Sequence, residues 1–179
     1  MDNIFLKHKN HTHADFFWGN LGDIKLGRGD LGEDMPVVVY RLMQYTMLDV
    51  LSKAYGLNTA NKHFYEAGYL AGKEFADNIL EMDVNFDSFI ANLQRKLEEL
   101  KIGILRMEAF DPTTGDIVLT VGQDLDCSGL PITNENVCIY DEGFISGILE
   151  RYTGLKYDVR EVDCWANGDR VCRFNGKPG

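Results

Sequence analysis

Apolar residues recur at helical spacing in several stretches of the chain. In residues 37–55 they fall on one side of a helix with about 3.6 residues per turn, and the positions that carry the pattern are Val38, Leu42, Tyr45, Leu48 and Leu51. Gly56 follows this stretch, and glycine is common at helix ends because it adopts the left-handed conformation without strain. The same spacing predicts further helices over residues 59–80, 89–100 and 137–152.

Alternation of apolar and polar residues predicts strands in the second half of the chain. Residues 104–110 and 117–121 alternate in this way, and the stretch Asp111-Pro-Thr-Thr-Gly115 between them has the composition of a turn. A second hairpin is predicted over residues 157–174. Its tight turn is expected at Asn167-Gly168, because both residues accept the positive φ that such turns require.

These elements predict an α+β fold in which a helical half packs on an antiparallel sheet. The domain is expected to cover residues 36–179, since no linker-like segment interrupts that range. Residues 1–35 mix histidine, glycine and acidic residues. They are expected to form an N-terminal arm with short strands, because residues 23–26 alternate in polarity.

The overall charge narrows the range of partners. The formal net charge is −10 at pH 7, and a nucleic-acid-binding protein needs a basic face to neutralise phosphates. No apolar run approaches the length of about 20 residues that a membrane-spanning helix needs. The first residues lack the features of a signal peptide. We therefore expect a cytoplasmic protein without a nucleic-acid partner or a membrane span.

Two cysteines near the end of the chain flank the predicted Asn-Gly turn. In an antiparallel hairpin, Cys164 and Cys172 would lie opposite each other or one residue apart, and opposed Cβ atoms are about 4.5–5.5 Å apart. Thiolates that share a tetrahedral zinc ion must lie this close together, because each sits about 2.3 Å from the metal. The hairpin therefore suits half of a metal site, and Cys138 and Glu161 are the best candidates for the other half.

Two alternatives to a metal site remain open for these thiols. They could form a disulfide, although reducing compartments disfavour one, or they could be small buried apolar groups. Cys127 lies in a stretch that resembles a loop or a short edge strand. It is interpreted as an unpaired thiol, and it is the natural substitute if Cys138 is not a ligand.

Other motifs carry less weight, and none predicts a catalytic residue. Residues 27–32 spell G-x-G-x-x-G, but the strand and helix that a dinucleotide site needs around this loop are missing. His8, His11 and His13 lie in a polar N-terminal stretch that is typical of a mobile chain end. No histidine is arranged with a serine, cysteine or aspartate for nucleophilic catalysis.

The C-terminal pattern Glu161-x₂-Cys164-x₇-Cys172-x-Phe174, with the preceding helix and the element order upstream, resembles the four-vinyl-reductase domain family, also called the hydrocarbon-binding domain. The resemblance covers residues 36–175. Relatives include the sensor domains of phenol-responsive activators, and the fold is more remotely similar to nitric-oxide sensors and vesicle-tethering subunits. It implies a homodimer that dimerises through its helices, with an apolar or aromatic ligand held between helices and sheet.

In the sensor members of that family, the matching positions ligate zinc. The resemblance therefore implies a structural zinc ion bound by Cys138, Glu161, Cys164 and Cys172. Side chains suited to an apolar pocket are expected among Phe89, Met107, Ile117, Leu119 and Trp165. The histidine and tryptophan that hold phenol in the sensors have no counterpart on the central strands, so phenol specificity is not implied.

The function expected from these residues is non-catalytic binding of an apolar small molecule, which an effector protein would detect. The family name suggests an alternative role as an accessory or catalytic subunit in the reduction of a tetrapyrrole vinyl group. A second alternative is a structural protein–protein interaction module, which would have a filled interior.

Overall fold

The structure is a computed structural model that describes residues 16–179. The chain divides into two compact units, residues 1–34 and 35–179, which are described separately. His8, His11 and His13 lie outside the described residues. In the first unit, a short 3₁₀ helix covers Trp18–Leu21 and one helical turn, α1, covers Ile24–Gly27.

The strand expected at residues 23–26 is therefore wrong. The carboxylate of Asp23 accepts a hydrogen bond of 2.9 Å from the amide of Leu26. An aspartate in this position satisfies an amide that has no partner within the helix, so it starts a helical turn where polarity alone suggested a strand.

The helices of the second unit follow the predicted segments closely. They are α2 (Val37–Tyr55), α3 (Leu57–Ile79), α4 (Phe86–Glu99) and α5 (Ile139–Thr153). Gly56 separates α2 from α3 with a φ of 84°, a value that side-chain-bearing residues rarely adopt. No helix of the described part is both long and apolar enough to cross a bilayer.

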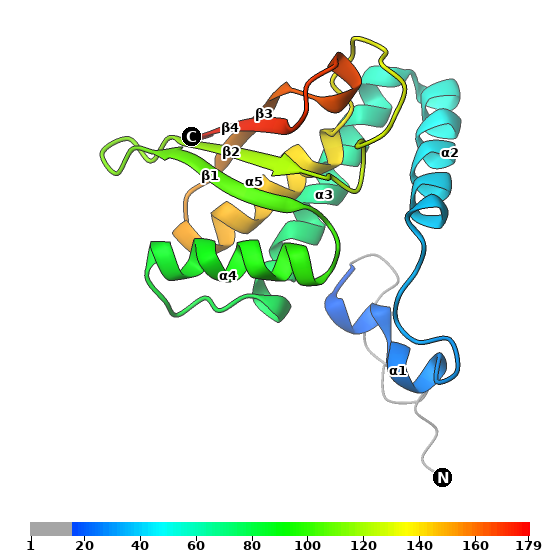
Figure 1. The fold of residues 1–179 in the computed structure, drawn as a ribbon, viewed down its shortest axis with the longest axis horizontal. Helices are drawn as coiled ribbons and strands as arrows, with labels where there is room; N and C mark the ends of the chain where they lie inside the picture. The colour runs from blue at the N-terminus through cyan, green and yellow to red at the C-terminus, as the bar shows by residue number, and fades with distance from the viewer. Residues whose placement is uncertain (1–15) are drawn as a thin grey trace. The chain divides into compact units, whose positions relative to one another are not determined.

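The strands form one antiparallel sheet in the order β1-β2-β4-β3. They are β1 (Ile104–Phe110), β2 (Ile117–Gly122), β3 (Tyr157–Asp163) and β4 (Cys172–Pro178). Helices α4 and α5 lie against this sheet, and α3 packs along α5 (Figure 1). The predicted α+β fold class, with helices on an antiparallel sheet, is confirmed.

The tight Asn-Gly turn expected between the last two strands is wrong. A 3₁₀ helix, Trp165–Asn167, follows β3, and Gly168 ends it with a φ of 97°. Glycine is used here for its positive φ, as predicted, but the turn belongs to a longer loop that starts at Cys164. Asp163 pairs with Arg173 across the sheet, which still brings Cys164 and Cys172 together.

Helices α3 and α5 approach each other through four glycines. Gly68 and Gly72 of α3 face the main chain of α5 at Tyr140 and Phe144. From α5, two glycines face the main chain of α3, namely Gly143 and Gly147. A Cβ atom at any of them would overlap a carbonyl oxygen of the other helix. The sequence-based expectation that small residues in α3 allow a second helix to come close is confirmed.

Candidate metal centre and adjoining cavity

Four buried cysteines from four different segments meet at one end of the sheet. Cys138 is the N-cap of α5, Cys164 directly follows β3 and Cys172 begins β4. The fourth, Cys127, lies in the loop after β2. Their exposed fractions are at most 1%. The cluster therefore ties the loop after β2, the start of α5 and the last two strands to one point.

The four sulfur atoms have the spacing of a metal site. All four lie within 4.8 Å of one another. Cys138 Sγ is 3.8 Å from Cys172 Sγ and 4.0 Å from Cys164 Sγ, and four thiolates about 2.3 Å from a tetrahedral ion would lie about 3.8 Å apart. The closest pair, Cys127 and Cys172, is 3.1 Å apart, well beyond the disulfide bond length of about 2.05 Å. This cluster could hold a metal ion.

The structure brings the three predicted cysteines together, but it adds Cys127 and places Glu161 beside them. One carboxylate oxygen of Glu161 accepts a hydrogen bond of 3.1 Å from the amide of Cys138, and the other is buried without a hydrogen-bond partner. Burial raises the pKa of Glu161 to about 8. The chain therefore offers four sulfur donors and an adjacent carboxylate, where the sequence suggested three sulfur donors and one carboxylate.

The electrostatics of the cluster favour a negative charge on one of its thiols. Hydrogen bonds from the other three cysteines, Cys127 first, lower the pKa of the Cys164 thiol far below its usual range. A thiolate is the form that binds metals. The direction of this shift suits metal binding, which requires deprotonated cysteines.

The loop that carries Cys127 is fastened to helix α2. The carboxylate of Asp126 accepts hydrogen bonds from Tyr40 at 2.8 Å and Gln44 at 2.7 Å. Arg41 donates to the carbonyl oxygens of Leu125, Asp124 and Ser128. The loop is also closed locally, since Asp124 Oδ1 accepts from the amides of Asp126 and Cys127. The run of Asp124, Asp126 and Cys127 was the only sequence signal for this turn.

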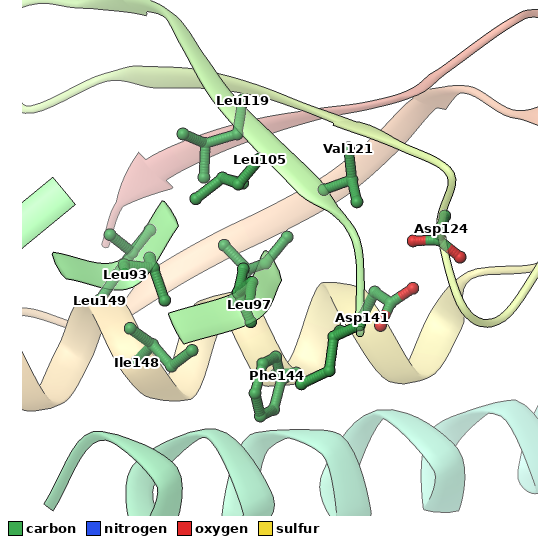
Figure 2. A pocket seen from close by; sticks show the side chains of 12 residues that line it. Leu93, Leu97, Leu105, Leu119, Val121, Asp124, Asp141, Phe144, Ile148 and Leu149 are labelled. Atoms are coloured by element: carbon green, nitrogen blue, oxygen red, sulfur yellow. The ribbon is translucent and has the colours of Figure 1, made fainter. Parts of the chain in front are cut away.

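A small apolar cavity adjoins the cluster between α4, α5 and the sheet. Its volume is about 20 Å³, close to the space that one water molecule needs. Side chains from α4, β1, β2 and α5 converge on it (Figure 2). The lining residues that carry the argument below are Leu97, Leu119, Phe144, Asp124 and Asp141.

Of the side chains expected in a ligand pocket, Leu119 lines this cavity and the others lie elsewhere. Phe89 stacks on Tyr152 with ring centroids 3.8 Å apart. Ile117 and Met107 pack in or against the core, and the Trp165 indole donates to the carbonyl oxygen of Leu130. The sequence pattern identified them as apolar but could not show which faced a cavity.

Two carboxylates stand at one end of the cavity, Asp124 from the loop and Asp141 from the first turn of α5 (Figure 2). Burial raises the pKa of Asp124 to about 6, helped by the charge of Asp126. The pKa of Asp141 is raised well above its usual value by burial and then by the charges of Asp126 and Asp124. An otherwise apolar cavity thus has one acidic end beside the cysteine cluster.

Helix α2 exposes a row of large apolar side chains. Val38 is 70% exposed, Leu42 is 65% exposed and Met43 is 61% exposed. Further along the same helix, Met47 and Val50 are 52% and 60% exposed. A contiguous apolar surface of this kind is common at protein–protein interfaces.

Comparison with known proteins identifies the domain type. Residues 117–178 match the four-vinyl-reductase domain family. A vinyl-4-reductase family protein from Methanocaldococcus jannaschii has a similar structure, with a TM-score of 0.57 and 17% identity over 83% of this chain and 85% of that one. The family resemblance expected from the sequence is confirmed.

Two further solved structures share the fold. The phenol-responsive sensory domain of the transcription activator PoxR, solved with phenol, gives a TM-score of 0.63 with 14% identity over 80% of this chain and 75% of that one. A trafficking protein particle complex subunit 3 from Naegleria fowleri, covalently bound to palmitic acid, gives 0.63 with 11% identity over 80% and 95% of the two chains. At these identities the similarity shows the fold alone.

Proposed function

We propose that this protein, whose residues 117–178 match the four-vinyl-reductase domain family, is a non-catalytic sensor that binds an apolar or aromatic small molecule and carries a structural zinc ion. The observation that carries the proposal is the buried cysteine cluster directly beside an apolar cavity. The PoxR sensory domain has the same fold and is a phenol-responsive domain. Binding in a cytoplasmic setting, with an effector protein as reader, completes the proposal.

Zinc is the metal that best suits the donor set. Four sulfur donors at tetrahedral spacing favour Zn²⁺ among the common divalent ions of proteins. A site closed by four protein ligands leaves no position for water, so the ion would be structural. It would hold the loop of Cys127, the start of α5 and the last two strands in register. Glu161 would then support the site through the Cys138 amide.

Ligand entry would require the cavity to expand. Its present volume of about 20 Å³ is much smaller than an aromatic ring. Helix α4 supplies Leu93 and Leu97 to the wall and packs on β1, so its displacement is the simplest way to enlarge the space. A ligand that moves α4 would convert occupancy into a change on the molecular surface.

Titration of apolar ligands is expected to raise the melting temperature of the zinc-loaded protein. A panel of phenols, larger aromatics and fatty acids, measured by thermal shift and calorimetry, tests this. Leu97→Phe should weaken binding at least about tenfold, equivalent to about 1.4 kcal/mol, because the larger ring occupies the cavity. The matched control is Leu80→Phe, at a buried residue outside the cavity lining. No binding across the panel would contradict the proposal.

We also propose that the apolar face of α2 forms a homodimer interface. Leu42→Glu should halve the molar mass measured by light scattering at micromolar concentration, because it places a charge in the centre of that face. The substitution should leave the fold intact, since Leu42 is already 65% exposed. Lys62→Glu on α3 is the control and should not change the mass. A monomeric parent protein would refute this assignment.

The small cavity also supports the second candidate, a protein–protein interaction module. An interior that holds about one water molecule is close to filled, and the exposed apolar face of α2 offers a binding surface. This candidate predicts no ligand-dependent stabilisation in the titration above, together with a stable complex that Leu42→Glu disrupts.

A further inference from the structure

A second set of metal-ligating side chains lies beside the cysteine cluster and shares Cys138 with it. The ligand atoms of Asp124, Cys138 and Asp141 all lie within 4.8 Å of one another. We propose that these three residues bind a second divalent metal ion, with the Cys138 thiolate bridging it to the zinc ion. This inference rests on the metal centre of the proposed function.

The two carboxylates are held in place as metal ligands are. Asp124 is 4% exposed. Its Oδ1 atom accepts hydrogen bonds of 2.8 Å and 3.1 Å from the amides of Asp126 and Cys127, which fix the orientation of the side chain. Such second contacts are typical of ligating carboxylates. Asp141 comes from the first turn of α5 and meets Asp124 at the end of the cavity (Figure 2).

An unsatisfied oxygen points to a missing partner at this site. The Oδ2 atom of Asp141 is buried and has no hydrogen-bond partner. Native proteins rarely leave a buried polar atom unpaired, and buried carboxylates are paired or coordinate metals. A cation between Asp124, Asp141 and Cys138 would supply the interaction that this oxygen lacks.

The charge of the neighbouring centre strengthens the argument. A zinc ion with four thiolates carries a net charge of about −2, and ionised Asp124 and Asp141 would add two further negative charges in a buried region. Like charges in a poorly solvated site repel strongly. A second divalent cation offsets the two carboxylates, and a bridging thiolate keeps the two ions at the separation of about 3.5–4 Å found in two-metal sites.

The second ion would differ from the first in having an open coordination position. Three protein ligands are typical of sites that also bind water or substrate, whereas four close a structural site. Asp124 and Asp141 both line the apolar cavity, so the open position faces it. The ligand class that this geometry selects is an apolar molecule with a lone-pair-donating head group, such as a thiol, a carboxylate or a phenolate.

Metal reconstitution tests the site directly. Metal-free protein is titrated with Co²⁺, and bound metal per chain is measured by elemental analysis together with the thiolate-to-cobalt absorption band. The parent protein should bind two ions, and coupling through the shared thiolate should weaken the electron paramagnetic resonance signal per ion. Asp141→Asn, which keeps the side-chain shape, should bind one ion and retain the full thiolate band. The matched control Asp83→Asn, at an exposed aspartate, should still bind two.

Each outcome separates the two proposals. One ion per parent chain with a full thiolate band overturns the second site and leaves the proposed zinc site standing. No bound ion and no thiolate band overturns both. A second ion that persists in Asp141→Asn is bound elsewhere on the surface and also overturns the second site. Should Asp141→Asn fail to fold, the count and the magnetic coupling in the parent protein still decide.

Discussion

Replacement of Cys164 by serine is expected to lower the free energy of unfolding by more than about 4 kcal/mol, a loss that single substitutions reach only through mechanisms such as the loss of a metal site. Cys164 is fully buried and follows β3 directly. Its thiolate would be one of four ligands that join the last two strands to α5 and to the loop after β2. Metal binding adds its free energy to folding, so one missing ligand weakens the whole centre.

Denaturation in urea, with and without a chelator, measures this effect. The chelator should lower the stability of the parent protein towards that of Cys164→Ser, and it should leave the variant nearly unchanged. The control is Val162→Ser, at a partly exposed position of β3 close to the cluster, which should cost less than about 1 kcal/mol and keep its response to the chelator. A parent protein whose unfolding ignores the chelator would rule out a stabilising metal.

The second large effect is expected at the contact between α3 and α5. Gly72→Ala should destabilise the protein by about 3 kcal/mol or more, because overpacking that a side chain cannot relieve forces a backbone shift. The new Cβ atom would overlap the carbonyl oxygen of Phe144. In an isolated helix the same change stabilises by about 0.5–1 kcal/mol, so the sign alone reports on the contact.

Thermal and urea unfolding would measure the change, and Gly27→Ala is its counterpart. Nothing lies within 4 Å of a Cβ atom built at Gly27, so that substitution should change stability by less than about 1 kcal/mol. If Gly72→Ala were neutral or stabilising, the two helices could not approach as closely as the structure shows.

The sequence predicted helices well and loops poorly, for a physical reason. The spacing of apolar residues in α2 depends on the period of the helix, and the predicted range of residues 37–55 matches the structure. The turn at Asn167-Gly168 depended on a local preference for positive φ, which a 3₁₀ turn satisfies as well as a tight hairpin does. A preference shared by two structures cannot choose between them.

The cysteine cluster shows a similar division. Cys164 and Cys172 are brought together by the register of adjacent strands, so spacing in the sequence was informative. Cys127 reaches the cluster through hydrogen bonds between its loop and helix α2, which no local pattern records. The lining of the cavity likewise depends on how α4 and α5 meet the sheet, so apolar composition predicted only Leu119 among its residues.

The order of the strands has a consequence for the way the protein is made. Strand β4 is synthesised after the other three, yet it lies between β2 and β3. During translation, β2 and β3 therefore emerge from the ribosome before the strand that joins them, and the thiol of Cys172 emerges with that strand. The nascent chain must keep two strand edges unpaired through this interval, so the sheet and the cysteine cluster close together in one late step of folding.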